Sequence, residues 1–257
     1  MITGAIVRRQ PFGGWKRSGV GPGAKVGGPN TLFVLGSWKP TEAPPTGDLA
    51  LGELDPRVAA FIEACQPAMN YEDFDRVRRG ALSDQAAWDT EYGTSRDISG
   101  LGVERNVFRY RPAEVTVRLA DGGDMTELVR VLAAGVRARA TMHVSSPTPL
   151  PSGVLALATA PNVIQDSVLP IRDVKVESDE AWQARAAIDR PGRIRLIGGG
   201  ASALATALGG APDVAIWGGP VTASGRVEVL PFMKEQAVSI TAHRFGNPDR
   251  GMAALVV

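Results

Sequence analysis

Hydrophobic positions follow a helical period between Asp55 and about Tyr92. Apolar residues recur three and four positions apart over this stretch, which predicts two amphipathic helices. Asp55 followed by Pro56 is typical of an N-cap and a first helical position, and Asn70 is expected to begin the second helix, because acidic residues occupy its first turn. The expected apolar face of the first helix consists of Val58, Phe61, Ile62 and Cys65.

From Pro112 onward, short apolar runs alternate with helical patterns. The expected strands are 115–119, 141–144, 174–176, 193–197 and 213–217, and the expected helices are 124–139, 180–188 and 201–208. Strands that alternate with helices of this length favour βαβ units and a parallel sheet. Right-handed crossovers between them predict an open, Rossmann-like α/β sheet.

Both ends of the chain depart from this alternation. Residues 1–38 form a glycine-rich N-terminal arm in which 31–35 has the pattern of a buried strand, and a proline-rich linker follows the arm. Residues 93–105 are expected to be a loop, whereas 226–230 and 237–243 have the alternation of two successive strands. The expected division is the arm at 1–38, a linker and helical segment at 39–111, and a sheet domain at 112–257.

Composition excludes several classes of protein. Lys plus Arg is 28 and Asp plus Glu is 27, so the net charge of +1 gives no reason to expect binding to nucleic acid or to an anionic membrane. No apolar run reaches the roughly 18 residues that span a bilayer. The first charges follow the apolar residues at the N-terminus, the reverse of a signal peptide, and one cysteine rules out an internal disulfide framework. A cytoplasmic location is therefore expected.

The arm carries the strongest motif. Residues 10–30 read QPFGGWKRSGVGPGAKVGGPN, which resembles the segment that closes the catalytic domain in the aldehyde dehydrogenase superfamily. More narrowly, it is similar to the L-glutamate-γ-semialdehyde (pyrroline-5-carboxylate) dehydrogenases and the bifunctional proline utilization proteins. The resemblance implies that Gly4 and Ala5 bind the amino-acid end of glutamate semialdehyde through backbone donors. It also implies that Phe12 packs on the aliphatic part of the aldehyde, while Gly13 and Gly14 turn the chain beside the active site.

The chemistry of that superfamily needs groups that this chain lacks. Aldehyde oxidation there uses a cysteine thiolate, a glutamate base and bound NAD, which several hundred preceding residues supply. The single cysteine, Cys65, lies on the predicted apolar face of a helix and outside the Gly-Gln-x-Cys context of the family nucleophile. We therefore expect no catalytic residue here, and NAD only as the cofactor of a parent enzyme, not bound by this chain alone.

Two other motifs are interpreted as structural. Gly198, Gly200 and Ala203 fit a dinucleotide fingerprint in form, but the next predicted strand is followed by glycines and has no acid at its end to bind a ribose. A tight turn without a ligand is the better interpretation. The two histidines, His143 and His243, are far apart and lack neighbours with metal-ligand spacing.

A second resemblance lies near the C-terminus. Residues 226–248 read RVEVLPFMKEQAVSITAHRFGNP, similar to the final motif of the longer proline utilization proteins. Those proteins carry an extra, non-catalytic Rossmann-like domain after the dehydrogenase, and their final motif helps to cover the substrate-channelling cavity. By this resemblance the chain ends in a docking tail, with Glu235, His243, Arg244 and Phe245 as its contact residues.

Together these patterns predict the C-terminal portion of an NAD-dependent L-glutamate-γ-semialdehyde dehydrogenase of proline breakdown, inactive by itself. A dehydrogenase catalytic body is the expected partner, and the oligomeric state stays open. A non-catalytic α/β module that assists a separately encoded dehydrogenase is the alternative, and a translated pseudogene fragment is a third possibility. The arm is expected to be loosely held, because its apolar residues have lost their partner and, without a substitute, leave either an exposed apolar patch or a mobile arm. These residues are Ile6, Phe12, Trp15, Leu32 and Phe33.

Overall fold

The computed structural model describes residues 6, 9–16, 18–37, 39, 50–101, 104–159, 169–241, 243–244, 247–248 and 251. Its strands are β1 (Arg96–Asp97), β2 (Glu104–Pro112), β3 (Glu114–Leu119), β4 (Thr141–Ser146), β5 (Ile171–Val176), β6 (Arg193–Ile197), β7 (Ala215–Trp217), β8 (Met233–Thr241), β9 (His243–Arg244) and β10 (Asn247–Pro248). Its α-helices are α1 (Pro56–Cys65), α2 (Tyr71–Ala87), α3 (Met125–Arg137), α4 (Ser152–Thr159), α5 (Asp179–Asp189), α6 (Ala201–Ala207) and α7 (Gly225–Glu228). Short 3-10 turns are η1 (Thr31–Val34), η2 (Leu51–Glu53), η3 (Gln66–Ala68) and η5 (Leu230–Phe232), and η4 (Trp88–Tyr92) is a π-helix.

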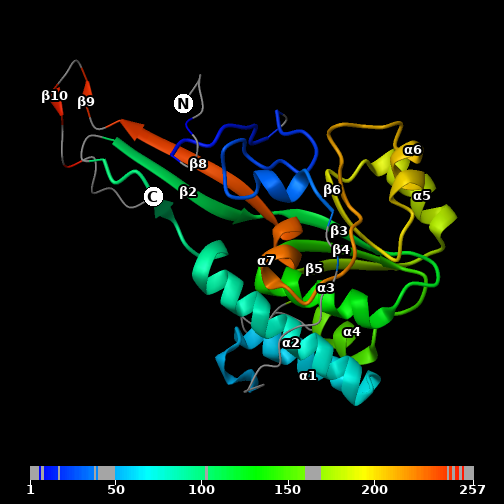
Figure 1. The fold of residues 1–257 in the computed structure, drawn as a ribbon. Coiled ribbons are helices and arrows are strands. Elements are labelled where there is room, and N and C mark those ends of the chain that lie inside the picture. Colours follow the sequence, from blue (N-terminus) through cyan, green and yellow to red (C-terminus); the bar gives the residue numbers. More distant parts are fainter. Residues whose placement is uncertain are drawn as a thin grey trace.

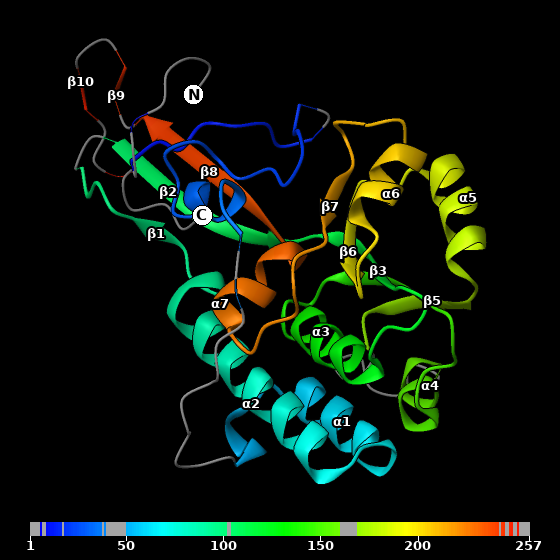
Figure 2. The same ribbon diagram turned by 45° about the vertical axis from the view of Figure 1, so that its right-hand side comes forward.

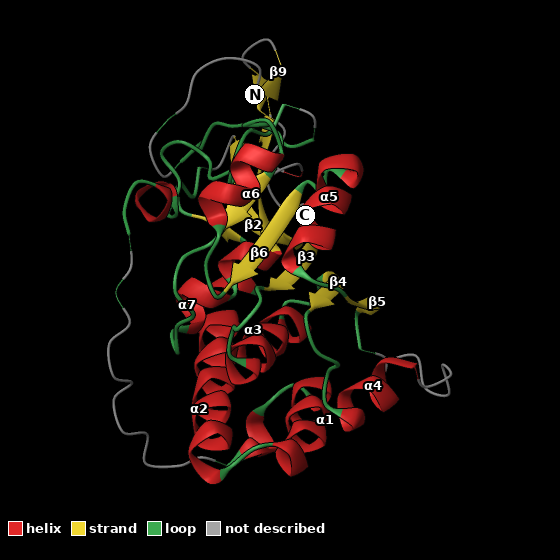
Figure 3. Ribbon diagram, turned by 90° about the vertical axis from the view of Figure 1, so that its right-hand side faces the viewer, coloured by secondary structure: helices red, strands yellow, loops and turns green. Residues whose placement is uncertain are grey.

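A parallel five-stranded sheet with helices on both faces forms the centre of this mixed α/β fold. The strand order is β5-β4-β3-β6-β7, so β3, the first of these five strands along the chain, lies in the middle. Helices α1 to α4 lie on one side of the sheet, and α5 and α6 lie on the other (Figure 1, Figure 3). A large core joins α1, α2 and α3 to one face, and a smaller core around Trp182, Ile194 and Leu204 fills the other. The predicted parallel sheet is confirmed.

Local sequence explains why the predicted helices form. Asp55 accepts a hydrogen bond from the N–H of Arg57 at the start of α1, and Asn70 accepts one from the N–H of Asp73 in α2. The expected face of α1 is completely buried. These elements are confirmed because caps and periodicity act between residues that are close in the chain.

A second, antiparallel sheet projects away from the first (Figure 2). In this sheet β2 pairs with β8 in a register that runs from Glu104 opposite Thr241 to Pro112 opposite Met233, and β1 flanks β2. The strand expected at 237–243 is therefore confirmed in its main part. Sequence analysis placed no strand at β2, whose partner lies far away in the chain.

Two other expected strands are wrong. Residues 226–230 form α7 and the start of η5, where Gly225 packs so closely on α2 that a Cβ there would lie 2.3 Å from the carbonyl oxygen of Ser83. Residues 31–35 contribute the single 3-10 turn η1, which contains no buried residue. A short apolar run or an alternation over only five residues does not distinguish a strand from a short helical turn.

A buried ion pair joins the helices below the sheet. The guanidinium of Arg130 on α3 donates to both carboxylate oxygens of Asp84 on α2, at 2.7 and 2.8 Å. Gly80 lies one turn earlier on α2, and a Cβ at this position would lie 2.2 Å from Nε of Arg130. The glycine is therefore needed to let the two helices approach around this pair.

We expect Gly80→Ala to lower the free energy of unfolding by about 1–3 kcal/mol, because the methyl group displaces the Arg130 guanidinium. Alanine is otherwise the better helix former by about 1 kcal/mol, so the sign of the change identifies the close contact. Urea denaturation measures it. Gly52→Ala is the control, since a Cβ at Gly52 meets nothing within 4 Å. An unchanged or raised stability for Gly80→Ala would contradict the packing.

Candidate functional site

The N-terminal arm lies along the β2–β8 pair (Figure 1). A cluster of polar side chains binds it there. We call this group the arm-docking cluster, and its members come from five separate parts of the chain. They are Lys25 and Asn30 of the arm, Glu91 of η4, Tyr110 of β2, Arg226 of α7 and Glu235 of β8. Tyr110 and Glu235 are directly opposite each other in the antiparallel register, so the ladder fixes the positions of these two members of the cluster.

Glu235 is the anion at the centre of the cluster. One carboxylate oxygen accepts from the backbone N–H of Lys25 and the other accepts from Nδ2 of Asn30, both at 2.5 Å. Burial raises the pKa of this carboxyl, while the two donors act in the opposite direction. Both of these donors belong to the arm, so the buried carboxylate depends on the arm for these hydrogen bonds.

Asn30 links this anion to the rest of the cluster. Its side chain is fully buried, and its Nδ2 also donates to the Tyr110 hydroxyl at 2.9 Å while its Oδ1 accepts from Arg226. Tyr110 donates in turn to Glu91 at 2.5 Å, and Arg226 forms an ion pair with Glu91 at 2.6 Å. Burial raises the pKa of Tyr110, so this phenol acts as a neutral donor.

The π-helix at the end of α2 explains the position of Glu91. A π-turn adds a residue to the helical repeat and redirects the side chains that follow it. Here it directs Glu91 and Tyr92 toward Arg226, whose Nη1 donates to the Tyr92 hydroxyl at 2.6 Å. The tyrosine rings at positions 92 and 110 pack edge to face with centroids 4.8 Å apart.

Two further contacts hold the arm. At its beginning, Arg9 and Gln10 donate to Glu104 at 3.0 and 2.9 Å, and Gln10 also donates to Asn106 on β2. In its middle, the backbone N–H of Gly21 donates to the carbonyl of Pro212 at 2.8 Å. The structure thus corrects the expectation of a loosely held arm. Of the apolar residues named for it, Phe12 and Leu32 are 50% and 78% exposed, whereas Phe33 packs on the large core.

The structure describes only some of the sequence-predicted site residues. Gly4, Ala5 and Phe245 lie outside the described residues, so their assigned roles stay predictions. His243 and Arg244 form the backbone of β9, and their side chains also lie outside the described part.

Phe12 and Glu235 are both described, and their roles differ. The backbone of Phe12 pairs with Val26, and its ring is half exposed. Glu235, which sequence analysis assigned to contacts of the tail, is buried and accepts hydrogen bonds from the arm, and its role in docking stays a prediction. The other cluster members were missed, because no local pattern marks a polar residue whose partners come from distant segments.

A cavity of about 350 Å³ lies between the arm and the amino ends of β3 and β6. Its charged lining includes Lys16 and Arg193 as well as Glu114 and Asp213. Arg193 already donates to the backbone carbonyls of Pro231, Met233 and Pro22. The charges are balanced and the buried cation is satisfied, so the lining indicates no particular ligand.

The glycine turn after β6 packs on the neighbouring loop at its first residue. A Cβ at Gly198 would lie 3.3 Å from both Ala120 and Gly123, and the N–H of Ala120 donates to the carbonyl of Ile197 at 2.8 Å. All three glycines at 198–200 are exposed, and a Cβ at either of the last two would meet nothing within 4 Å. The turn lies between β3 and β6, where an open α/β sheet places its ligands, and the interpretation that it binds none stays a prediction.

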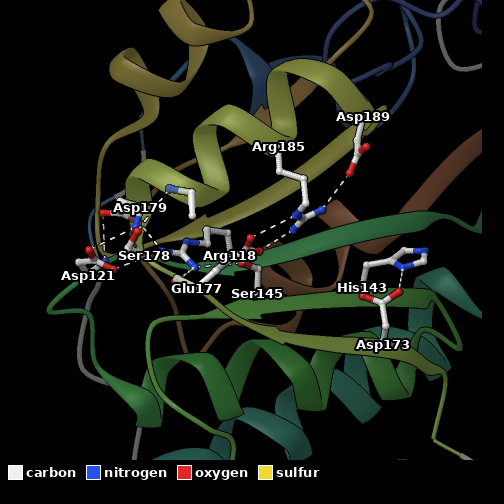
Figure 4. A network of polar contacts seen from close by, with 11 residues as sticks. Arg118, Asp121, His143, Ser145, Asp173, Glu177, Ser178, Asp179, Arg185 and Asp189 are labelled. Atoms are coloured by element: carbon white, nitrogen blue, oxygen red, sulfur yellow. Dashed lines mark hydrogen bonds and ion pairs between the residues drawn. The ribbon is translucent and has the colours of Figure 1, made fainter.

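Side chains also fill the carboxyl ends of β3, β4 and β5 (Figure 4). The fully buried Arg118 donates to Ser145 at 2.9 Å and to Asp179 at 2.7 Å. Asp179 and Asp121 accept hydrogen bonds from each other's backbone N–H groups, at 3.1 and 3.2 Å, across the start of α5. A protein carboxylate therefore takes the position where a helix N-terminus would otherwise receive an anionic ligand.

Cys65 does not have the surroundings of a reactive thiol, whereas His143 contacts two carboxylates. Cys65 is fully buried, and burial raises the pKa of its thiol to about 12. His143 lies between carboxylates of Asp173 and Glu114, at 2.6 and 3.1 Å. Within the part of the chain that the structure describes, no group of three or more potential ligands could hold a metal ion. None of the described helices is long and apolar enough to cross a bilayer.

Comparison with known proteins reveals similarity to proline utilization proteins. No family model matches the chain. The bifunctional protein PutA of Salmonella typhimurium is 34% identical over 142 residues, which are 53% of this chain and 11% of that protein. The bifunctional protein PutA of Escherichia coli is 33% identical over 174 residues, 63% of this chain and 13% of that protein. The chain thus matches only a small part of the length of these relatives.

A solved structure shows the same similarity across nearly the whole chain. The structure of proline utilization A (PutA) from Corynebacterium freiburgense superposes with a TM-score of 0.60 at 35% sequence identity. The match covers 95% of this chain and 20% of that chain. Nearly the whole chain is therefore similar to a part of a much larger protein.

We expect the thiol of Cys65 to be inert toward aromatic disulfide reagents in the native protein. With a pKa of about 12, roughly one thiol in ten thousand is ionised at pH 8, and burial blocks access as well. Absorbance should show labelling at the rate of unfolding, and complete labelling in urea. Because this is the single cysteine, Cys65→Ser should abolish the signal. Rapid labelling in native buffer would contradict the assignment.

We expect Asn30→Leu to release the arm, because Glu235 then loses a donor and Arg226 loses an acceptor. Each buried polar group left unsatisfied costs about 1–3 kcal/mol, which is relieved when the arm detaches. Trypsin should then cleave after Lys25, which is 4% exposed in the docked arm. Leu32→Ala, an exposed change in the same segment, is the control. Equal cleavage rates in the two variants would show that the cluster does not hold the arm.

Proposed function

We propose that this chain is the C-terminal accessory portion of a PutA-like protein and acts in proline breakdown. Its role is to hold the final segment of a dehydrogenase catalytic body, which oxidises L-glutamate γ-semialdehyde to glutamate with NAD. The observation that carries this proposal is the contact of Glu235 on β8 with Lys25 and Asn30. The arm is the part that resembles the end of a catalytic domain, and the sheet domain binds it through a buried polar cluster.

The exposed apolar surface of the arm supports a large partner. Many of the exposed large apolar side chains of the described chain come from this segment. They are Ile6, Phe12, Val20, Val26, Leu32, Val34 and Leu35. Apolar side chains concentrated on one segment of a soluble protein mark an interaction surface. We assign this surface to the catalytic body, in the cytoplasm, either within the same polypeptide or as a separately encoded dehydrogenase.

The central sheet supports a non-catalytic role. Its order, with its first strand in the middle, supports the proposal of a Rossmann-like doubly wound sheet. Arg118 with its carboxylate partners fills the strand ends next to the point where the strand order reverses, which supports this role. We therefore infer that NAD belongs to the catalytic body and that this sheet serves as a scaffold.

The test combines this chain with the dehydrogenase body of a PutA relative that ends before the segment corresponding to residues 1–38. We expect no NADH formation by this chain alone, and co-elution with higher NADH formation when the two are mixed. Glutamate semialdehyde is the substrate and absorbance at the NADH band is the readout. Failure to co-elute, with the body also inactive in the mixture, would refute the proposed role.

A truncated variant tests the docking tail in the same mixture. The structure sets the cut after Thr241, because residues up to that position pair with β2 and an earlier cut would damage the ladder. We expect removal of 242–257 to leave the fold intact, as judged by circular dichroism, and to remove the gain in activity. An undiminished gain would assign docking to the arm alone.

A further inference from the structure

We propose that Lys25 is a positioning residue that clamps the Phe12–Gly14 turn of the arm to β8. The proposal rests on the proposed function, because the turn matters for catalysis only if the arm completes a dehydrogenase active site. The clamp would make the accessory sheet responsible for the shape of the loop that contacts the aldehyde.

Lys25 contacts both sides of this link. Its backbone N–H donates to Glu235 of β8 at 2.5 Å, which fixes the residue on the ladder. Its ammonium donates to the carbonyl oxygens of Gly13 and Gly14, at 2.7 and 3.0 Å. One residue therefore connects the β8 strand with two successive carbonyls of the turn.

The buried position of Lys25 makes its hydrogen bonds to the turn costly to break. Lys25 is 4% exposed, and burial lowers the pKa of its ammonium, while the nearby carboxylate of Glu235 acts in the opposite direction. A buried ammonium needs acceptors, and the two carbonyls supply them. The turn can therefore not move away from Lys25 without leaving a buried cation unsatisfied.

The turn is constrained on its other side as well. Gly14 lies so close to Ser18 that a Cβ at Gly14 would be 2.0 Å from the Ser18 carbonyl oxygen. Phe12 and Val26 exchange two backbone hydrogen bonds, at 3.0 and 2.7 Å, next to Lys25. With the backbone fixed on both sides, the half-exposed ring of Phe12 is presented from a single backbone position.

The backbone hydrogen bond of Lys25 can be separated from its side-chain hydrogen bonds by mutation. The bond to Glu235 uses the backbone, so Lys25→Met retains it and retains most of the buried aliphatic volume. The same change removes the donors to Gly13 and Gly14. A residue that merely attached the arm would give a detached arm, whereas a positioning residue gives an attached arm with a looser turn.

Hydrogen exchange of the full chain tests the clamp itself. In Lys25→Met we expect the amides of Phe12 and Val26 to exchange about tenfold faster, as loss of charged hydrogen bonds predicts, while amides around Asn30 are unchanged. Lys25→Arg, which keeps a charged donor, should restore much of the protection. Lys234→Met, a change at an exposed position on β8, is the control. Unchanged exchange at Phe12 in Lys25→Met would overturn the proposal.

Kinetics in the mixture with the dehydrogenase body test whether the clamp reaches the reaction. Lys25→Met should co-elute with the body as the wild-type chain does, and should raise KM for glutamate semialdehyde about tenfold, with a smaller change in KM for NAD. Equal kinetics for Lys25→Met and wild type would overturn the proposal while the proposed function stands. A wild-type chain that neither binds nor activates the body would instead refute the proposed function, and with it the link to the substrate.

Discussion

The antiparallel pairing of β2 with β8 is the constraint on which the rest of the structure depends. Asn106 and Ser239, which form a side-chain hydrogen bond across it, are 133 positions apart in sequence. Only Ala113 separates β2 from β3, and the Ala113 N–H donates to the carbonyl of Phe232 just before β8. The β2–β8 ladder is therefore a direct continuation of the parallel sheet, which holds it in place. Because Tyr110 and Glu235 are opposite each other in its register, a slip by one residue would turn both side chains away from the arm.

Buried charge gives the ladder its selectivity for one segment. A carboxylate taken out of water is costly unless hydrogen bonds replace its hydration, and Glu235 receives these bonds from Lys25 and Asn30 of the arm. An apolar contact of the same size would accept many registers of a glycine-rich segment. The polar cluster accepts one, because Asn30 must satisfy Glu235, Tyr110 and Arg226 at once. The arrangement thus trades some stability for a defined position of the arm.

Sequence analysis predicted the helices and the parallel sheet because their signals are local. The caps at Asp55 and Asn70 and the apolar periods act within a few residues. It missed β2, whose pairing depends on a strand at the other end of the domain, and it was wrong at 31–35 and 226–230, where short alternating runs form helical turns instead. For the site, Glu235 was named for contacts of the tail, but its partners in the arm follow from the fold alone. A buried polar cluster assembled from five segments leaves no spacing in the sequence that could reveal it.

The carboxyl ends of the parallel strands support the proposed role of this sheet as a scaffold. In an open α/β sheet, ligands bind outside these ends, at the point where the strand order reverses. Here Arg118 and Asp179 occupy the adjoining strand ends with charges that satisfy each other. The contacts with the arm lie at the other ends of the strands, where the amino end of β3 continues from the ladder that carries the arm.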